Sequence, residues 1–257
     1  MRLGIVGGTG WLGSALGRAV LEKGVLQPQN LSILNRTGPQ DSYFGHRVHW
    51  PADLAGLISE SDVIVLSIRP QDWEGLGLLA GDRLVISFMA GIGMNRLAAC
   101  GGRILRAMPN AAAAIGRSYT PFVAAEGVSA SDRATAMALL GAFGATEELP
   151  DEAQLDLMTA VSGAGPAYPA LLAMVLAQFL TARGVAPEVA ERAALNVVRD
   201  CPALIGAESG AAGAMVQTFL DYAGTTAAGL LAARNSGFES ALTAGLDAAL
   251  TRAANVG

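Results

Sequence analysis

A glycine-rich segment near the start of the chain has the residue types and spacing of a site for a phosphorylated ligand. Residues 3–16 read LGIVGGTGWLGSAL, so an apolar run leads into glycines at positions 7, 10 and 13 and then into a helical pattern. Glycine permits a tight turn and close approach of backbone N–H groups to a pyrophosphate, and the helix start adds partial positive charge. This pattern predicts a dinucleotide site, although a purely structural strand-to-helix turn would look the same. The expected contacts are Gly7, Gly8, Thr9, Gly10, Trp11 and Leu12.

The residues after the second apolar run indicate which dinucleotide fits. That run, LSIL at 31–34, is followed by Asn35, Arg36 and Thr37. A site for NAD places Asp or Glu here to bind the ribose 2′-hydroxyl, whereas an Arg and a hydroxyl suit a 2′-phosphate. Because this turn holds no carboxylate, we expect NADP. The alternative is that Arg36 is a solvated turn residue.

Two further strand ends carry candidate cofactor contacts. Ser67, Ile68, Arg69 and Pro70 stand at the end of the apolar run 62–67 and belong to the carboxyl edge of a sheet, where doubly wound folds bind ligands. Arg69 is expected to serve the cofactor phosphates, or else to be a solvated charge at a helix end. Ala90, after the apolar run 83–87, offers small backbone that could face a nicotinamide.

In the second half, a cluster of small and hydroxyl residues could bind a carboxylate. Gly224, Thr225 and Thr226 open a helical pattern, so free backbone N–H groups and two hydroxyls come together. An N-terminal helix cap with no ligand is the equally simple interpretation. Ser162 lies in a second Gly- and Pro-rich cluster, which could equally be a helix break.

The remaining reactive residue types do not form a catalytic or metal-binding pattern. The chain has two Cys and two His, with no metal-ligand spacing, no Ser-His-Asp order, no G-x-S-x-G and no Cys-His pair. We therefore expect no metal site. The chemistry should rest on a bound cofactor, with the protein supplying position and hydrogen bonds.

The elements that must position these residues fall into two halves. Up to about residue 149, short apolar runs alternate with helical stretches, which predicts a parallel sheet covered by helices on both faces. The runs are 2–6, 31–35, 47–50, 62–67, 83–87, 103–107 and 119–124. After residue 151, Ala, Leu and Met recur at helical spacing and no β-rich run remains. We expect an α/β domain over 1–150 and an all-α domain over 151–257.

Composition limits the partners. The net charge is −5 and no polybasic run occurs, which argues against nucleic acid or an anionic membrane surface. Charged residues make up 15% of the chain, against about 25% in an average globular protein. The longest apolar stretch, around 169–180, is shorter than the ~20 residues of a membrane span, and the start MRLGIVGG is unlike a signal peptide. These features predict a cytoplasmic protein that hides apolar surface in an oligomer.

Four short motifs, in this order, resemble those of the pyrroline-5-carboxylate reductases. The segment SIRPQ at 67–71 looks like the A-V-K-P-Q of that family, and RAMPN at 106–110 looks like R-x-M-P-N. DLMTAVSGAGPAY at 156–168 is similar to D-A-V-T-A-L-S-G-S-G-P-A-Y. GTT at 224–226, followed by Gly237 and Phe238, looks like the G-T-T and G-G-F of the family signature.

This resemblance implies a fold and an activity. It implies a Rossmann-type NADP-binding domain, followed by a helical domain that binds substrate and dimerises through interlocking helices, giving a homodimer or higher homo-oligomer. The implied reaction is NADPH-dependent reduction of the cyclic imine 1-pyrroline-5-carboxylate to proline. Thr226 would be the catalytic residue, hydrogen-bonded to the ring nitrogen, while Ser162, Gly224 and Thr225 would hold the substrate carboxylate.

The chain also departs from the family pattern. The loop GGTGWLG looks more like that of deazaflavin-dependent NADP reductases, Arg69 replaces a Lys, and M-P-N-T-P has become M-P-N-A-A. Asp221 stands where the family has a Ser near the substrate carboxylate, and two carboxylates ~4 Å apart repel by ~1–4 kcal/mol. The alternatives are therefore a reductase of a different imine or a deazaflavin-type acceptor, or a non-catalytic NADP-binding protein.

Overall fold

The computed structural model describes residues 1–254 as two compact units. Met1–Gly165 and the chain from Ala249 form the first unit, and Pro166–Ala248 form the second. The division falls after Gly165, beyond the boundary predicted at 150/151, because the helix Glu152–Met158 (α5) packs on the sheet of the first unit through its buried Leu155.

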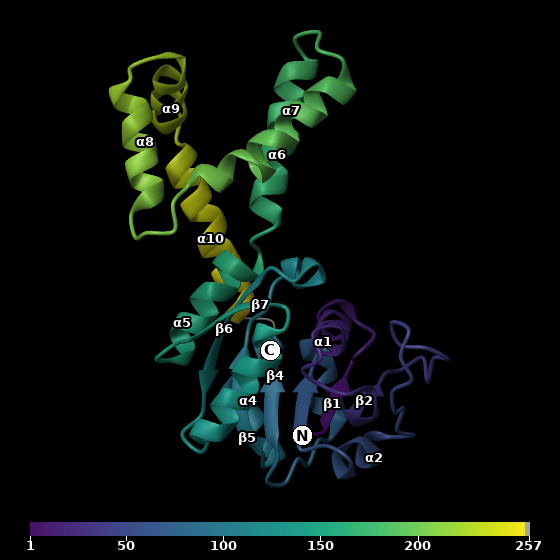
Figure 1. The fold of residues 1–257 in the computed structure, drawn as a ribbon. Coiled ribbons are helices and arrows are strands. Elements are labelled where there is room, and N and C mark those ends of the chain that lie inside the picture. Colours follow the sequence, from purple (N-terminus) through teal and green to yellow (C-terminus); the bar gives the residue numbers. More distant parts are fainter. Residues whose placement is uncertain (255–257) are drawn as a thin grey trace. The chain divides into compact units, whose positions relative to one another are not determined.

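A seven-stranded sheet forms the centre of the first unit (Figure 1). Its strands are β1 (Leu3–Val6), β2 (Leu31–Leu34), β3 (Val63–Leu66), β4 (Leu84–Ser87), β5 (Arg103–Ala107), β6 (Ser118–Ala124) and β7 (Gly144–Glu148). The strand order is β2-β1-β3-β4-β5-β6-β7, and all neighbours are parallel except β5 and β6. The order reverses between β1 and β3, which is where open α/β sheets bind ligands at the carboxyl ends of their strands. The predicted doubly wound, Rossmann-type sheet is thus confirmed.

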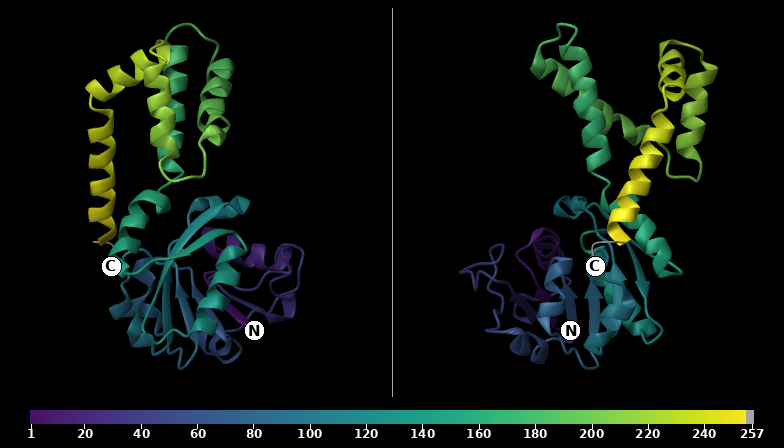
Figure 2. Two further views of the ribbon diagram at one scale, coloured as in Figure 1. Left: turned by 60° about the vertical axis from the view of Figure 1, so that its left-hand side comes forward. Right: turned by 180° about the vertical axis from the view of Figure 1, so that it is seen from behind.

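Helices cover both faces of this sheet (Figure 2). One core contains Leu16 of α1 (Trp11–Glu22) and Leu140 of α4 (Ala130–Gly141). The other contains Leu57 of α2 (Leu54–Ser59) and Leu97 of α3 (Met94–Leu97). The central strands β1, β3 and β4 are buried along their whole length, as expected of strands covered on both faces.

Two strand predictions were wrong at the sheet edges. Residues 47–50 form a single bridge, in which His49 pairs with Ser32, because Pro51 follows directly and has no N–H to continue the ladder. β7 was missed because its sequence, GATEE, is polar and half exposed. An edge strand needs no buried face and so gives no apolar signal.

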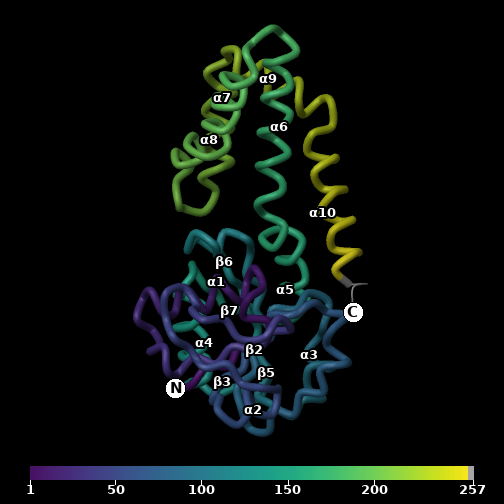
Figure 3. Tube along the Cα trace, turned by 90° about the vertical axis from the view of Figure 1, so that its right-hand side faces the viewer, coloured from purple at the N-terminus to yellow at the C-terminus, as the bar shows by residue number. Residues whose placement is uncertain are grey.

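The second unit is helical, as predicted. Its helices are α6 (Ala167–Thr181), α7 (Pro187–Arg199), α8 (Ala211–Asp221) and α9 (Thr225–Asn235), with most of α10 (Phe238–Ala254). Helices α6 and α7 pack side by side, as do α8 and α9, and Figure 3 traces the chain from α6 through a short loop into α7. Over residues 166–248 the buried hydrophobic side chains are all alanines, at positions 173, 190, 194, 211 and 227.

One helical stretch of the described residues, Glu152–Thr181, has the length and apolar composition of a membrane span. A single stretch of this kind is weak evidence, because the core helix of a soluble protein has the same character.

Candidate functional site

The glycine loop between β1 and α1 is held in a conformation that requires glycine. Gly7 has φ +83°, and a Cβ there would lie 2.2 Å from the carbonyl oxygen of Ser67. A Cβ on Gly13 would lie 2.5 Å from the carbonyl oxygen of Gly7, so α1 packs directly on the turn. Gly8, Gly10 and Gly13 also satisfy the spacing G-x-G-x-x-G. The loop therefore has the tight turn and the close helix packing of a dinucleotide-binding loop.

The start of α1 is open to a ligand. Gly10 is its N-terminal cap and has no side chain, so no side chain satisfies the first backbone N–H groups of the helix. The buried hydroxyl of Tyr43 donates a 2.7 Å hydrogen bond to the carbonyl oxygen of Gly8 and so stabilises the conformation of the loop. Such a helix start attracts the phosphate groups of a nucleotide.

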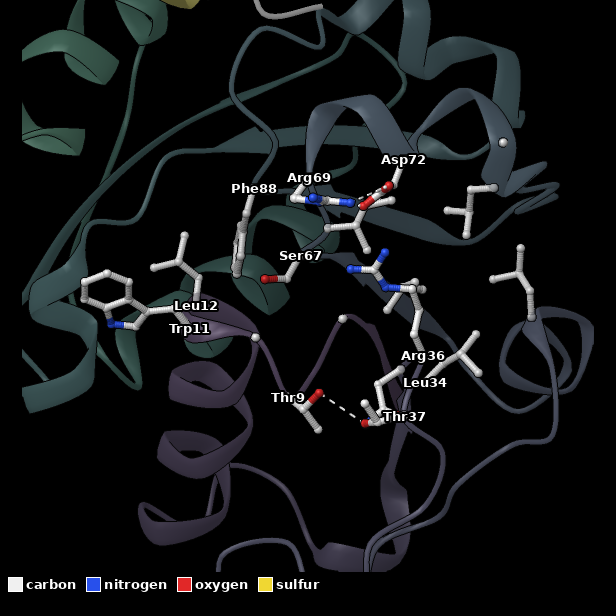
Figure 4. A pocket seen from close by; sticks show the side chains of 18 of the residues that line it. Thr9, Trp11, Leu12, Leu34, Arg36, Thr37, Ser67, Arg69, Asp72 and Phe88 are labelled. Carbon is white, nitrogen blue, oxygen red and sulfur yellow. Dashed lines mark hydrogen bonds and ion pairs between the residues drawn. The ribbon is translucent and has the colours of Figure 1, made fainter.

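A cavity of about 940 Å³ opens at the carboxyl ends of β1, β2 and β3 (Figure 4). The structure brings most of the predicted cofactor contacts together around it: Gly7, Thr9, Gly10, Trp11, Leu12, Asn35, Arg36, Thr37, Ser67, Ile68 and Arg69. Gly8, Pro70 and Ala90 lie outside its lining. Phe88, which precedes Ala90 by two residues, lines the cavity and is almost fully buried.

Asn35 joins the end of β2 to the glycine loop. Its Nδ2 donates a hydrogen bond to Thr9 Oγ1 at 3.1 Å, while its Oδ1 is buried without a hydrogen-bond partner in the described part of the chain. Because a buried polar atom normally has a partner, this oxygen marks a position beside the cavity where the described residues leave a hydrogen bond unmade.

Two carboxylates line the cavity that the sequence did not place there. Asp72 forms a two-contact ion pair with Arg69, with Nε–Oδ2 at 3.0 Å and Nη2–Oδ1 at 3.2 Å. This hydrogen-bonded guanidinium holds the pKa of the Asp72 carboxyl below its ordinary value, and the charge of Arg36 acts in the same direction. Figure 4 shows the Arg36 guanidinium pointing toward this pair. Asp53 is the other carboxylate, and it caps α2 by accepting the N–H of Gly56 at 2.8 Å.

The predicted substrate residues belong to different units. Ser162 lies in a π-helical turn, Thr159–Gly163, at the end of the first unit, where its hydroxyl donates to the carbonyl oxygen of Met158 at 3.2 Å. Gly224 caps the start of α9 in the second unit without a side-chain hydrogen bond, so Thr225 and Thr226 open that helix with free N–H groups.

Asp221, the departure noted in the sequence, is the last residue of α8. Its carboxylate accepts a 2.7 Å hydrogen bond from Nε2 of Gln217, one turn earlier in the same helix. Within this chain the hydrogen-bond partner of the Asp221 carboxylate thus lies in α8 and not in the loop 222–226.

Taken together, the cavity fits a dinucleotide that carries a 2′-phosphate. The uncapped helix start suits the pyrophosphate, the glycines allow close approach of the backbone, and the guanidinium groups of Arg36 and Arg69 line the same cavity. A nicotinamide dinucleotide supplies hydride chemistry.

Comparison with known proteins covers both halves of the chain. Residues 2–91 match a family model described as NADP oxidoreductase coenzyme F420-dependent, and residues 152–256 match one described as pyrroline-5-carboxylate reductase dimerisation. The pyrroline-5-carboxylate reductase of Synechocystis is 31% identical over 265 residues, covering 100% of this chain and 98% of that protein. That of Thermus thermophilus is 36% identical over 208 residues, covering 77% of each.

Solved structures show the same fold. The 1-pyrroline-5-carboxylate reductase of Streptococcus pyogenes has a TM-score of 0.80 at 26% identity and covers 99% of this chain and 98% of its own. A Plasmodium falciparum pyrroline carboxylate reductase with NADP bound has a TM-score of 0.84 at 21% identity, and the match covers 100% of this chain and 98% of that one.

Proposed function

The chain belongs to the pyrroline-5-carboxylate reductase family, and on this premise we propose that it reduces 1-pyrroline-5-carboxylate to proline with NADPH. The observation that carries this proposal is the cavity at the carboxyl edge of the sheet, which has the helix start and the arginines that bind phosphate groups. The chain around it matches a pyrroline-5-carboxylate reductase along its whole length. The enzyme is thus an NADP-dependent oxidoreductase acting on a C–N bond.

The first unit holds the cofactor. The loop from Gly7 to Leu12 binds the pyrophosphate through backbone N–H groups at the start of α1, and Arg36 and Thr37 bind the 2′-phosphate. The bound cofactor supplies a hydride to the carbon of the C=N bond. Gly8, Pro70 and Ala90 lie outside the lining of the cavity and remain predicted contacts.

The start of α9 holds the substrate. Its free N–H groups at Gly224 and Thr225 suit a carboxylate, with Ser162 as a further donor. The Thr226 hydroxyl holds the proton at the ring nitrogen, and a protonated imine accepts hydride more readily than a neutral one.

The proposed assembly is a homodimer or a larger homo-oligomer built through the helical domain, for which the dimerisation family model over 152–256 is the support. The partners are a small imine substrate and further copies of the chain, with neither nucleic acid nor membrane. A cytoplasmic location remains a prediction from composition.

The test is NADPH oxidation in the presence of pyrroline-5-carboxylate. Thr226→Ala should lower kcat/KM while leaving the Kd for NADPH unchanged, because this hydroxyl is assigned to the imine and not to the cofactor. Thr218→Ala is the matched control, since it removes a hydroxyl that bonds within α8 to the carbonyl oxygen of Ala214. Equal loss in both variants would contradict the role of Thr226.

A reductase of a different imine is the second candidate, and Asp221 is the observation that favours it. If Asp221 faces the substrate carboxylate, Asp221→Ser should lower KM for pyrroline-5-carboxylate by about tenfold, the factor that corresponds to ~1.4 kcal/mol. A wild-type enzyme that is inert toward this imine, and stays inert after the substitution, would point to another imine, one whose positive charge Asp221 attracts.

A further inference from the structure

A buried arginine joins the sheet to the helix that precedes the π-helical turn. Arg106, near the carboxyl end of β5, is 2% exposed, and its guanidinium contacts the carboxylates of Glu152 and Asp156, the latter at 3.1 Å. Both carboxylates come from α5 and are four residues apart, so one helix face presents them together. A buried charge needs such partners, because removing one of them leaves the other charge uncompensated.

Glu152 has a second partner outside this ion pair. Its Oε1 accepts the backbone N–H of Met94 at 2.7 Å, and a Cβ added at the neighbouring Gly93 would lie 3.5 Å from the same oxygen. Met94 begins α3, directly after the turn that follows β4. One carboxylate therefore ties together the end of β5, the turn after β4 and the start of α5.

The segments joined in this way are those assigned to the reaction. The turn after β4 contains Phe88, which lines the cofactor cavity, and Ala90, which is predicted to face the nicotinamide. α5 continues into the π-helical turn that carries Ser162, a predicted substrate contact. All of these residues belong to the first unit.

A second arginine on the same strand makes a two-contact ion pair, in a more exposed position, that touches none of these segments. Arg103 binds Asp132 of α4 through two contacts, at 2.8 and 2.9 Å. Neither residue lines the cofactor cavity. This pair is a matched control for the loss of an ion pair on β5.

We infer that Arg106 and Glu152 are positioning residues for the reduction: they hold the turn after β4 against α5 and so fix the nicotinamide-facing backbone relative to Ser162. The inference rests on the proposed function. Asp156 contributes less to this role, because it balances the charge of Arg106 while Glu152 in addition binds the turn.

The decisive variant is Glu152→Gln, which keeps the size of the side chain, removes the charge that pairs with Arg106, and leaves only a neutral, weaker acceptor for the Met94 N–H. We expect kcat for pyrroline-5-carboxylate to fall by roughly tenfold to a hundredfold, the effect of a small misplacement of reacting groups, with the Kd for NADPH unchanged. Asp156→Asn should lower kcat less. Asp132→Asn should lower the melting temperature without lowering kcat.

The second measurement needs no substrate. Hydrogen exchange of the amides in 88–94 should become faster in Glu152→Gln than in the wild type, and should be unchanged in Asp132→Asn. The inference would be overturned if Glu152→Gln kept both the kcat and the amide exchange rates of the wild type. It would also be overturned if Glu152→Gln and Asp156→Asn lost kcat equally. If the wild type binds NADPH but does not reduce this imine, the proposed function fails, and the exchange measurement still decides whether Glu152 holds the turn.

Discussion

At the scale of single residues, two arginines and two aspartates line the cavity, and we expect Arg36, Arg69 and Asp72 to determine the choice of cofactor. The positive charges of Arg36 and Arg69 favour binding of a phosphate. The carboxylate of Asp72 pairs with Arg69 and repels the phosphate groups of the cofactor. The carboxylate-free turn after β2 predicts NADP, but the sequence does not show that Asp72 reaches the same cavity from the segment after β3. The balance of these charges is open to direct test.

Arg36→Ala should remove most of the preference for NADPH over NADH. A charge-assisted hydrogen bond to a phosphate contributes about 1–3 kcal/mol. The substitution weakens NADPH binding by this amount and leaves NADH binding unchanged, because NADH has no 2′-phosphate. Fluorescence titration of both cofactors against wild type and variant measures the difference. Equal affinities of the wild type for the two cofactors would contradict the assignment of Arg36 to the 2′-phosphate.

Asp72→Asn should strengthen NADPH binding several-fold at low salt. The change removes the charge that holds Arg69 and that repels the incoming phosphates. Salt screens exposed charges, with a Debye length of about 3 Å at 1 M, so the gain should shrink as salt is added. Asp82→Asn is the control, because Asp82 is exposed and precedes β4, at the amino ends of the strands and away from the cavity at their carboxyl ends. Weaker binding in Asp72→Asn would instead mean that Asp72 orients Arg69 for the cofactor.

At the scale of elements, the sequence predicts best what is buried and regular. The strands β1, β3 and β4 are continuous apolar runs, and Gly7 marks a turn that no other residue could make, so both were predictable. The polar edge strand β7 was not, because its pairing with β6 gives no pattern within its own residues. Likewise, the contact of Arg106 with Glu152 joins residues far apart in sequence, and only the packing of α5 on the sheet brings them together.

The start of α4 gives a prediction on pH. Asp132 accepts hydrogen bonds from Arg103 and from Ser129, and these partners hold the pKa of its carboxyl well below the ordinary 3.8. A carboxyl whose pKa is lower in the folded state stabilises the fold above its unfolded pKa, and this contribution is lost as pH falls toward the folded pKa.

Asp132→Asn should therefore unfold more easily than the wild type at pH 7. The difference between the two should shrink below about pH 4. Urea unfolding of both proteins across this range measures it. A difference that does not change with pH would mean that the capping hydrogen bonds, and not the charge, account for the effect.

At the scale of the whole molecule, the helices of the second unit are too apolar to face water. α6 is apolar on all sides, and a helix of that kind is normally buried. Yet Leu171, Val175 and Phe179 are each more than half exposed within the single chain. Alanines at the contacts bring α6 and α7 together and cover little of this surface. These faces require a partner, and the dimerisation family model over the same residues indicates a second copy of the chain.

Sedimentation at low micromolar concentration should accordingly show no monomer, because obligate interfaces commonly bury more than ~2,000 Å² and leave no stable free subunit. Val175→Asp places a charge in the middle of α6, where burial without a partner is costly, and should give monomer or aggregate and abolish activity. Leu79→Asp is the matched control: this side chain is 75% exposed in the first unit and should tolerate the charge with the oligomer intact. A stable, fully soluble wild-type monomer would contradict the assembly, since the exposed faces of α6 would then be in contact with water.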